Sequence, residues 1–127
     1  MLNKIIAFDL DDVLCSRTSN EGDVDKYKSC EPNKEMIMIL NKCYEKGHKI
    51  IIYTARGMTV FKGNVNDIYA NLYEITKNQL DQWGVNYHQL IMGKVHFDLF
   101  IDDKAVNSNL IKNISDIDNY LKDVNSN

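Results

Sequence analysis

The sequence lacks a long hydrophobic run, because no stretch of its 127 residues approaches the ~20 apolar residues that a membrane-spanning helix requires. A signal-peptide pattern is also missing at the amino end, so we expect a cytoplasmic protein with no membrane partner. There is no excess of basic residues: the formal net charge is -3 at pH 7, and the Lys and Arg residues are scattered. This charge pattern argues against nucleic acid as a partner.

The cysteines form no recognisable metal or redox motif. Cys15, Cys30 and Cys43 are odd in number and lack CxxC spacing, so three free thiols are the default expectation in a reducing compartment. A zinc site built from these cysteines and His48 is the alternative, although no close pair of ligands would nucleate it. The length of the chain suits a single domain over residues 1–127.

A short apolar run precedes a group of carboxylates near the start of the chain. Residues 5–8 are apolar and too short for a confident helix, which indicates a strand buried on both faces of a parallel sheet. Asp9 and Asp11 follow one residue apart and would point to the same side of a continuing strand. Close carboxylates repel unless a hard cation such as Mg2+ lies between them. The alternative is a strand that ends in a solvated acidic turn.

Further along the chain, short β-branched runs alternate with amphipathic helical patterns. The pattern predicts a loop or small hairpin that acts as a flap, a helix opened by Pro32, and then alternating strands and helices. The predicted ranges are residues 15–31 for the flap, 49–53, 88–92 and 97–101 for strands, and 67–83 and 115–124 for the later helices. We therefore expect an α/β fold, a three-layer α/β/α sandwich with a mainly parallel, Rossmann-like sheet.

Polar residues follow three of the predicted strands. Asp9 and Asp11 follow the first, Thr54 ends the second, and Asp102 and Asp103 follow the last. The carboxyl ends of parallel strands meet at one edge of a sheet, so these side chains should converge. Carboxylates, a hydroxyl and a nearby lysine suit metal-assisted phosphoryl transfer, in which a cation and hydrogen-bond donors neutralise the phosphoryl group.

In four motifs, the sequence resembles the haloacid dehalogenase (HAD) superfamily of phosphatases. Its first motif, an apolar strand followed by D-x-D-x-[VT], matches residues 5–13, and its second, a strand ending in Ser or Thr, resembles residues 50–54. Lys94 resembles the lysine of the third motif, and residues 99–103 match the acidic pair of the fourth. The motifs occur in the family's order.

This resemblance implies a mechanism and a ligand set. Asp9 would attack phosphorus to form an aspartyl-phosphate, and Asp11 would act as general acid and then general base. Thr54 would donate a hydrogen bond to the transferring group and Lys94 would neutralise it, although Lys94 could instead be a surface lysine. The implied Mg2+ ligands are the Asp9 side chain, the Asp11 backbone carbonyl, Asp102 and Asp103.

The substrate is the part of the function about which the sequence says least. The flap and the loop over residues 57–66 are too short for a cap domain, so we expect a capless member. The resemblance is closest to small members linked to capsular or surface polysaccharide biosynthesis, which implies a sugar or polyol phosphate. A nucleotide, a nucleic-acid end or a phosphoprotein is the alternative. Arg56, Lys62 and Tyr27 are candidate substrate contacts, and the second loop could support a homo-oligomer.

Two other classes of protein share part of this pattern. A response-regulator receiver domain also carries an acidic cluster, but its lone phosphoacceptor Asp should end a central strand. Here the second strand ends in Tyr53 and Thr54, and nothing in the receiver pattern explains Asp102 and Asp103. A metal-binding glycosyltransferase would need a longer chain. A non-enzymatic relative that only binds phosphate is the remaining alternative.

Overall fold

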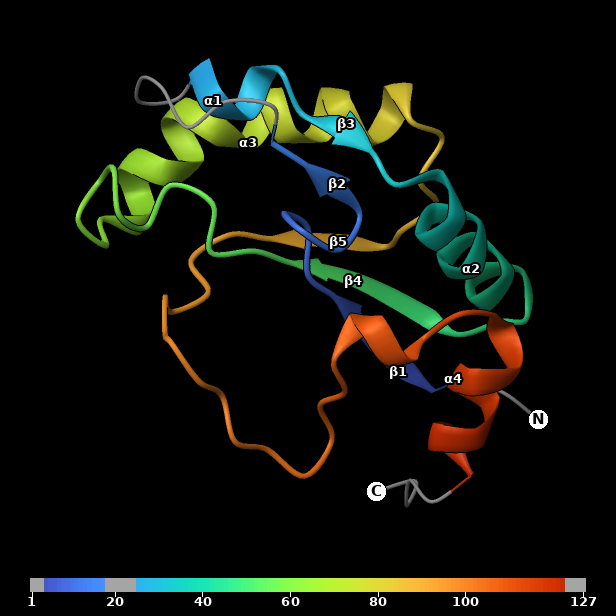
Figure 1. Ribbon diagram of the computed structural model, residues 1–127. Coiled ribbons are helices and arrows are strands. Elements are labelled where there is room, and N and C mark those ends of the chain that lie inside the picture. Colours follow the sequence, from blue (N-terminus) through green and yellow to red (C-terminus); the bar gives the residue numbers. More distant parts are fainter. Residues whose placement is uncertain (1–3, 18–24, 123–127) are drawn as a thin grey trace.

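A three-stranded parallel sheet organises the protein (Figure 1), whose computed structural model describes residues 4–17 and 25–122. The strands are β1 (Ile5–Phe8), β4 (Lys49–Tyr53) and β5 (Gln89–Ile91), in the order β1-β4-β5. β1 pairs with β4 from Ile5↔Lys49 to Phe8↔Ile52, and β4 pairs with β5 up to Tyr53↔Ile91. The predicted fold class, a small α/β fold with a mainly parallel sheet, is confirmed.

Two long helices connect the strands. Helix α2 (Lys34–Glu45) leads from β1 to β4, and α3 (Val65–Gln82) leads from β4 to β5. Both begin close to their predicted starts, after asparagine caps: Asn33 accepts from the Met36 amide and Asn64 from the Asp67 amide. Such a cap satisfies a backbone donor that the helix leaves free.

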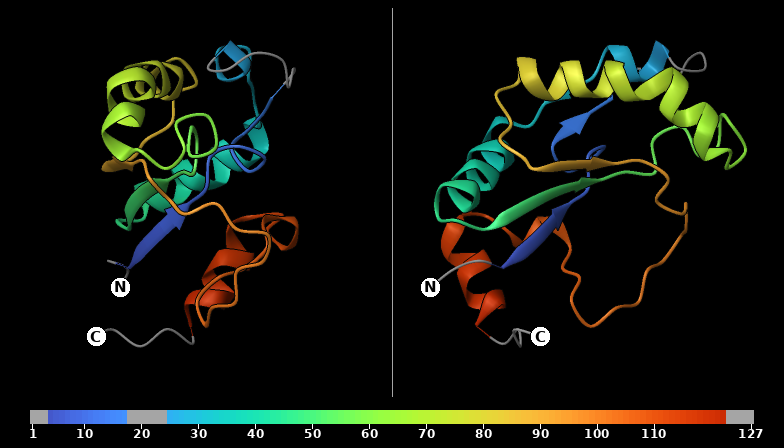
Figure 2. Two further views of the ribbon diagram at one scale, coloured as in Figure 1. Left: turned by 90° about the vertical axis from the view of Figure 1, so that its left-hand side faces the viewer. Right: turned by 180° about the vertical axis from the view of Figure 1, so that it is seen from behind.

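The last part of the chain forms a 3-10 turn, η1 (Ser108–Leu110), and the helix α4 (Ile114–Leu121). A capping box joins Asn113 and Asp116 at the start of α4. An ion pair of 2.9 Å between Lys46 and Asp118 ties α4 to the end of α2, and Figure 2 shows α4 beside β1. No helix in the described ranges is long and apolar enough to span a membrane.

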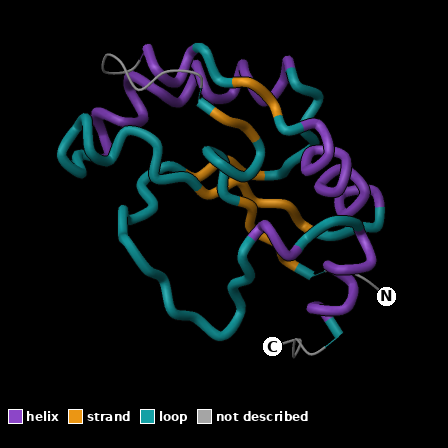
Figure 3. The backbone as a smooth tube through the Cα atoms, in the orientation of Figure 1, coloured by secondary structure: helices purple, strands orange, loops and turns teal. Residues whose placement is uncertain are grey.

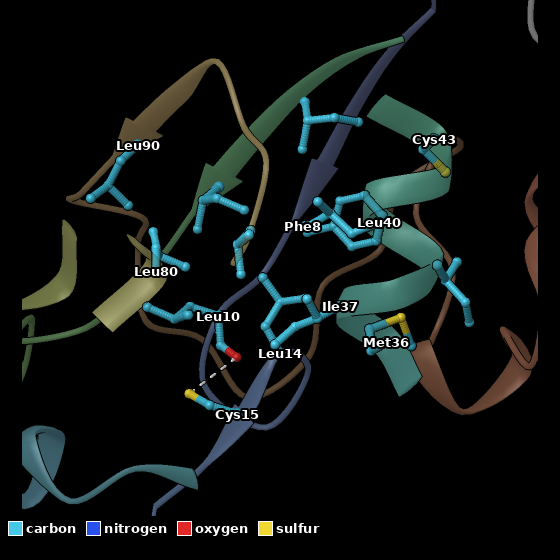
Figure 4. Packing of buried hydrophobic residues seen from close by; sticks show 14 of the residues in the cluster. Phe8, Leu10, Leu14, Cys15, Met36, Ile37, Leu40, Cys43, Leu80 and Leu90 are labelled. Atoms are coloured by element: carbon cyan, nitrogen blue, oxygen red, sulfur yellow. Dashed lines mark hydrogen bonds between the residues drawn. The ribbon is translucent and has the colours of Figure 1, made fainter. Parts of the chain in front are cut away.

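The hydrophobic core lies between the sheet and the two long helices. Alternate residues of the strands, such as Phe8, Ile50 and Ile52, are buried against Leu40 of α2 and Leu80 of α3 (Figure 4). Burying a side chain of this size stabilises the fold by roughly 1.5–3 kcal/mol. The largest fully buried aliphatic side chains are Leu10, Leu14, Leu40, Ile50, Ile52, Ile68, Leu72 and Leu80.

The other face of the sheet is not buried as predicted. Ile5 is 66% exposed and Tyr53 is 39% exposed. β1 is an edge strand, and its side chains alternate between the core and solvent. The prediction that β1 is buried on both faces is therefore wrong, because Ile5 and Ala7 are exposed while Phe8 on the other face is buried.

Residues 97–101, predicted as the last strand, form part of a long loop instead. Figure 3 shows this loop after β5, and Figures 1 and 2 show it extending away from the sheet. Leu99 is 77% exposed and Ile101 is 87% exposed, although both are residues of a strand-like pattern. This strand prediction is wrong here, because a β-strand needs a hydrogen-bonded neighbour and the segment has none.

The predicted flap contains a small antiparallel pair. β2 (Cys15–Ser16) pairs with β3 (Glu31–Pro32), and the short helix α1 (Asp25–Lys28) precedes β3. Residues 18–24 of the flap lie outside the described part of the chain. The described part agrees with a small hairpin that follows the end of β1.

Candidate active site

Asp9, Thr54 and Lys94 come together at the carboxyl ends of the three parallel strands. Asp9 directly follows β1, and Thr54 directly follows β4. The Lys94 amide donates to the Thr54 carbonyl at 3.1 Å, which ties the loop after β5 to the end of β4. Lys94 Nζ lies 3.8 Å from Asp9 Oδ2. The structure thus places three of the four predicted catalytic residues at one edge of the sheet.

The Asp9 carboxylate is partly removed from water. Its side chain is 38% exposed, and its Oδ1 accepts from the Leu10 amide at 2.8 Å. Burial raises the pKa of Asp9, while the Leu10 hydrogen bond and the Lys94 charge oppose that rise. An oxygen of Asp9 stays open to solvent, so this carboxylate can meet a ligand.

Thr54 and Lys94 supply donors beside Asp9. The Thr54 side chain is 1% exposed, and its hydroxyl oxygen accepts from the Arg56 amide at 3.0 Å. The hydroxyl hydrogen of Thr54 can still be donated to another group. The Lys94 ammonium lies over the Tyr53 and Phe97 rings, 5.8 and 5.4 Å from their centroids, and these contacts help to hold it beside Asp9.

A tight turn separates Asp11 from Asp9. The Leu10 carbonyl accepts from the amides of Leu14 and Cys15 at 2.8 and 3.2 Å, and Asp12 adopts a positive φ of 68°. Asp tolerates this left-handed backbone better than most residues. β1 has ended at Phe8, so the expectation that both carboxylates lie on one continuing strand is wrong.

Asp11 is bound by a buried arginine. Arg56 is 2% exposed, and its Nε and Nη2 donate to the two Asp11 oxygens at 3.1 and 2.8 Å. Its Nη1 donates to Thr76 Oγ1 at 3.2 Å and Gln79 Oε1 at 2.7 Å. Burial acts to lower the pKa of Arg56, but the hydrogen bonds and charge of Asp11 outweigh it and raise that pKa. A bidentate pair of this kind fixes both side chains.

Two of the predicted substrate contacts lie in the interior. Arg56 directs its guanidinium to buried partners, and Tyr27 is 4% exposed with its ring 4.9 Å from that guanidinium. The Tyr27 hydroxyl accepts from the Gly57 amide at 3.1 Å. Neither Arg56 nor Tyr27 reaches solvent in this structure, and their contact with substrate stays a prediction. Lys62 is exposed, and its contact with substrate stays a prediction.

Cys15, Cys30 and Asp11 form a cluster of metal-ligand atoms. The two sulfurs and a carboxylate oxygen lie within 4.8 Å of one another, so the group could hold a metal ion. Two thiols do not suit Mg2+, which prefers oxygen ligands. Hydrogen bonding between the thiols raises the pKa of Cys15 and lowers that of Cys30.

Asp102 and Asp103 are not brought to Asp9. Both are exposed in the loop after β5, and the charged groups that act on Asp9 are Lys94, Asp11 and Asp12. The structure does not show the expected convergence of this acidic pair with Asp9, and their role as metal ligands stays a prediction. The physical reason is the missing strand at residues 97–101, which would have carried the pair to the edge of the sheet.

Sequence reasoning missed the polar partners of Arg56. Thr76 and Gln79 lie on the inner face of α3 together with Leu72 and Leu80, and all four are buried. Their spacing was the available signal, since polar residues on an apolar helical stripe need partners inside the protein. Cys15 and Cys30, expected as ordinary free thiols, also belong to this interior network.

The site around Asp9 lies open on the surface. A hollow of about 560 Å³ runs along α2 towards Trp83, and another of about 160 Å³ lies between Asp12 and η1. Neither of these two hollows is lined by Asp9, Thr54 or Lys94.

The fold resembles known structures. The crystal structure of a target protein from Vibrio cholerae matches with a TM-score of 0.78 and 30% identity, covering 94% of this chain and 97% of that chain. Two structures of the Pnkp1/Rnl/Hen1 complex, one described as an RNA repair complex, match with TM-scores of 0.53 and 0.52 at 18% and 17% identity. They cover 86% and 97% of this chain but 33% and 32% of those chains, and show the fold alone. No family model and no curated protein matches the sequence.

Proposed function

We propose that this chain, which belongs to the same family as the Vibrio cholerae protein, is a phosphatase that hydrolyses a phosphomonoester through Asp9. One observation carries the proposal: the Asp9 carboxylate lies 3.8 Å from the Lys94 ammonium at the carboxyl edge of a parallel sheet, where Thr54 follows the neighbouring strand. Ligands of open α/β sheets bind at this edge. The resemblance of the sequence motifs to the HAD superfamily supports the same activity.

In the proposed reaction, an Asp9 oxygen attacks phosphorus, the P–O ester bond breaks, and the oxygen that leaves takes a proton from Asp11 or from water to depart as the alcohol. Water then hydrolyses the aspartyl-phosphate and releases inorganic phosphate. The Lys94 ammonium, 3.8 Å from Asp9, reduces the repulsion between the carboxylate and the phosphoryl oxygens. The Thr54 hydroxyl, buried in this structure, would donate its hydrogen to one of those oxygens where the ligand opens the sheet edge.

A Mg2+ ion is part of the proposal, and the described donors fit it in part. Asp9 offers an oxygen ligand, whereas the cluster of Asp11, Cys15 and Cys30 offers two sulfurs. Asp102 and Asp103 would complete an oxygen set only if the loop that contains them moves. When bound, Mg2+ would supply positive charge against the phosphoryl oxygens.

The edge of β1 is where that loop could dock. β1 has no neighbour on its outer side within the described chain, and residues 97–101 have the apolar pattern of a strand without a partner. We infer that this segment adds to β1 in the active form, which would move Asp102 and Asp103 towards Asp9. Exposed Leu99 and Ile101 would then be covered.

The proposed role of Asp11 as general acid and base requires its release from Arg56. Both Asp11 oxygens already accept hydrogen bonds from the guanidinium, and Arg56 is itself held by Thr76 and Gln79. We therefore propose Asp11 first as the residue that orders the turn after Asp9. Proton transfer by Asp11 requires that at least one of its oxygens first leaves the Arg56 guanidinium.

For the substrate we propose a sugar or polyol phosphate, such as those used in surface polysaccharide synthesis. The open surface around Asp9 also admits a nucleic-acid end or a phosphoprotein. The shared fold with part of an RNA repair complex is the reason to test nucleic-acid ends directly. A cytoplasmic location and a homo-oligomer stay predictions.

The test is phosphate release from sugar, polyol, nucleotide, RNA-end and phosphopeptide substrates, with Mg2+ or with EDTA. We expect turnover only with Mg2+, its loss in Asp9→Asn, and a large reduction in Lys94→Met. Lys49→Met is the matched control, because Lys49 is exposed at the opposite end of β4. Wild-type turnover by Asp9→Asn would refute the mechanism, and preference for RNA ends would change the substrate class only.

A further inference from the structure

Two thiols and a guanidinium share one interior cluster beneath the candidate active site. Cys15 and Cys30 place their sulfurs within 4.8 Å of each other, and Arg56 Nη2 lies 3.8 and 3.6 Å from the two sulfurs. The β2–β3 register pairs Cys15 with Pro32, so Cys30 lies diagonally across the pair on the same side. The two thiols are therefore neighbours, although they are distant in sequence.

The position and charge of Arg56 limit the chemistry of this cluster. Its Nη1 is anchored by Thr76 and Gln79, which holds Nη2 against the sulfurs and Asp11. A metal ion bound by Asp11 and both sulfurs would meet this fixed positive charge, which disfavours a cation site. The same guanidinium lies against both sulfurs and holds them side by side, where oxidation can join them.

We propose that Cys15 and Cys30 are a dithiol that hydrogen peroxide or an organic hydroperoxide oxidises to a disulfide. Cys30 is the half-buried member of the pair and the one that peroxide can reach, whereas Cys15 is 1% exposed. Cys43 lies on the buried face of α2, outside this cluster, and provides an internal reference thiol.

The reaction balances with peroxide as the two-electron oxidant. The Cys30 sulfur attacks one peroxide oxygen, the O–O bond breaks, and the departing hydroxide takes the thiol proton as water. This step leaves a sulfenic acid on Cys30. The Cys15 sulfur then attacks the Cys30 sulfur, the S–O bond breaks, and the hydroxyl group leaves with the Cys15 proton as a second water. Two thiols are oxidised and one peroxide is reduced to two waters.

The disulfide would change the support of Asp11. A disulfide holds its sulfurs at about 2.05 Å, so the short β2–β3 pair must draw together. It also removes the S–H donors that reach Asp11 Oδ1 from Cys15 at 3.4 Å and from Cys30 at 3.9 Å. Oxidation therefore acts on the turn that follows Asp9 while leaving Asp9, Thr54 and Lys94 chemically unchanged.

The experiment treats the reduced full chain with hydrogen peroxide, quenches with an alkylating agent and maps the peptides without reduction. We expect a peptide linked between Cys15 and Cys30 and an alkylated Cys43, with the link forming at least about tenfold faster in the folded than in the urea-unfolded protein. Cys43→Ser should form the same link at the same rate. Cys15→Ser should stop at a sulfenic acid on Cys30, which a dimedone-type probe captures.

Three results would overturn the proposal. The first is overoxidation of Cys30 without a link to Cys15, and the second is a link that forms no faster than in unfolded protein. The third is protection of both thiols by equimolar Zn2+, which would make the cluster a metal site. The readout is covalent structure and not turnover, so its failure leaves the proposed phosphatase activity untouched, and the reverse also holds.

Discussion

Replacing Arg56 with Met tests whether this arginine stabilises the fold or contacts a ligand. The substitution keeps an unbranched side chain but leaves the Asp11 carboxylate, 16% exposed, without its cation. Breaking one side of a buried ion pair costs about 3–5 kcal/mol. Thr76 and Gln79 lose a donor as well, at about 1 kcal/mol each. Because Asp11 keeps some contact with water, its part of the cost should fall to about 1–2 kcal/mol, so we expect a total loss of about 3–4 kcal/mol.

Urea unfolding followed by fluorescence of Trp83, the single tryptophan, measures this loss. With a slope of about 2 kcal/mol per molar urea, the midpoint should fall by roughly 1.5–2 M. Lys62→Met, an exposed residue on the neighbouring loop, should change the free energy of unfolding by less than about 0.5 kcal/mol.

A double-mutant cycle assigns the effect to the pair. Asp11→Asn removes the charge that Arg56 faces, so the double variant should cost about 1–3 kcal/mol less than the sum of the two single losses. Two results together would refute the interior role of Arg56: a loss of less than about 1 kcal/mol in the free energy of unfolding of Arg56→Met, and no coupling in the cycle. Contact with substrate would then be the better explanation for Arg56.

Three further predictions concern the fold. Gly57→Ala should cost about 1–3 kcal/mol, because φ is +85° and the new Cβ would lie 2.5 Å from Leu72 Cδ1. Gly63→Ala, with φ at +78° and nothing within 4 Å, should cost only about 1 kcal/mol; equal losses in urea unfolding would contradict the contact. Asn113→Ala should lower the free energy of unfolding by about 1 kcal/mol through loss of the α4 cap, and a loss near zero would mean that the cap is not formed in solution. Burial lowers the pKa of His48 below its ordinary value of 6.5, so the unfolded chain takes up a proton first as the pH falls. Stability should therefore decrease as the pH falls below 6.5 towards the lowered pKa, and His48→Asn, which keeps an acceptor for the Lys4 amide, should reduce that decrease in thermal melts; an unchanged slope would exclude His48 as its source.

Local residue patterns predicted the helices and strands whose formation depends mainly on the residues within them. The apolar runs of β1 and β4 and the stripes of α2 and α3 each contain the information for their structure, and the parallel order followed from the connections. The gathering of Asp9, Thr54 and Lys94 could also be predicted, because each follows the end of a parallel strand.

The structure of residues 97–101 and the environment of Arg56 depend on interaction partners elsewhere in the chain, which the sequence of one segment does not identify. Residues 97–101 have the composition of a strand, but composition does not supply the hydrogen-bonded neighbour that a strand needs. Arg56 was equally ambiguous, because the sequence pattern of an arginine after a strand is the same whether the side chain faces solvent or a buried carboxylate. Only the inward positions of Thr76 and Gln79 on α3 distinguish the two.

The open edge of β1 also affects how the protein behaves in a concentrated sample. An edge strand presents unpaired backbone N–H and C=O groups, and Ile5 adds an exposed apolar side chain beside them. Such an edge is a template on which a strand from another molecule can add, which is the first step of ordered aggregation. Occupation of this edge by the chain's own residues 97–101 would remove the template, so colloidal stability on storage should follow the position of that loop.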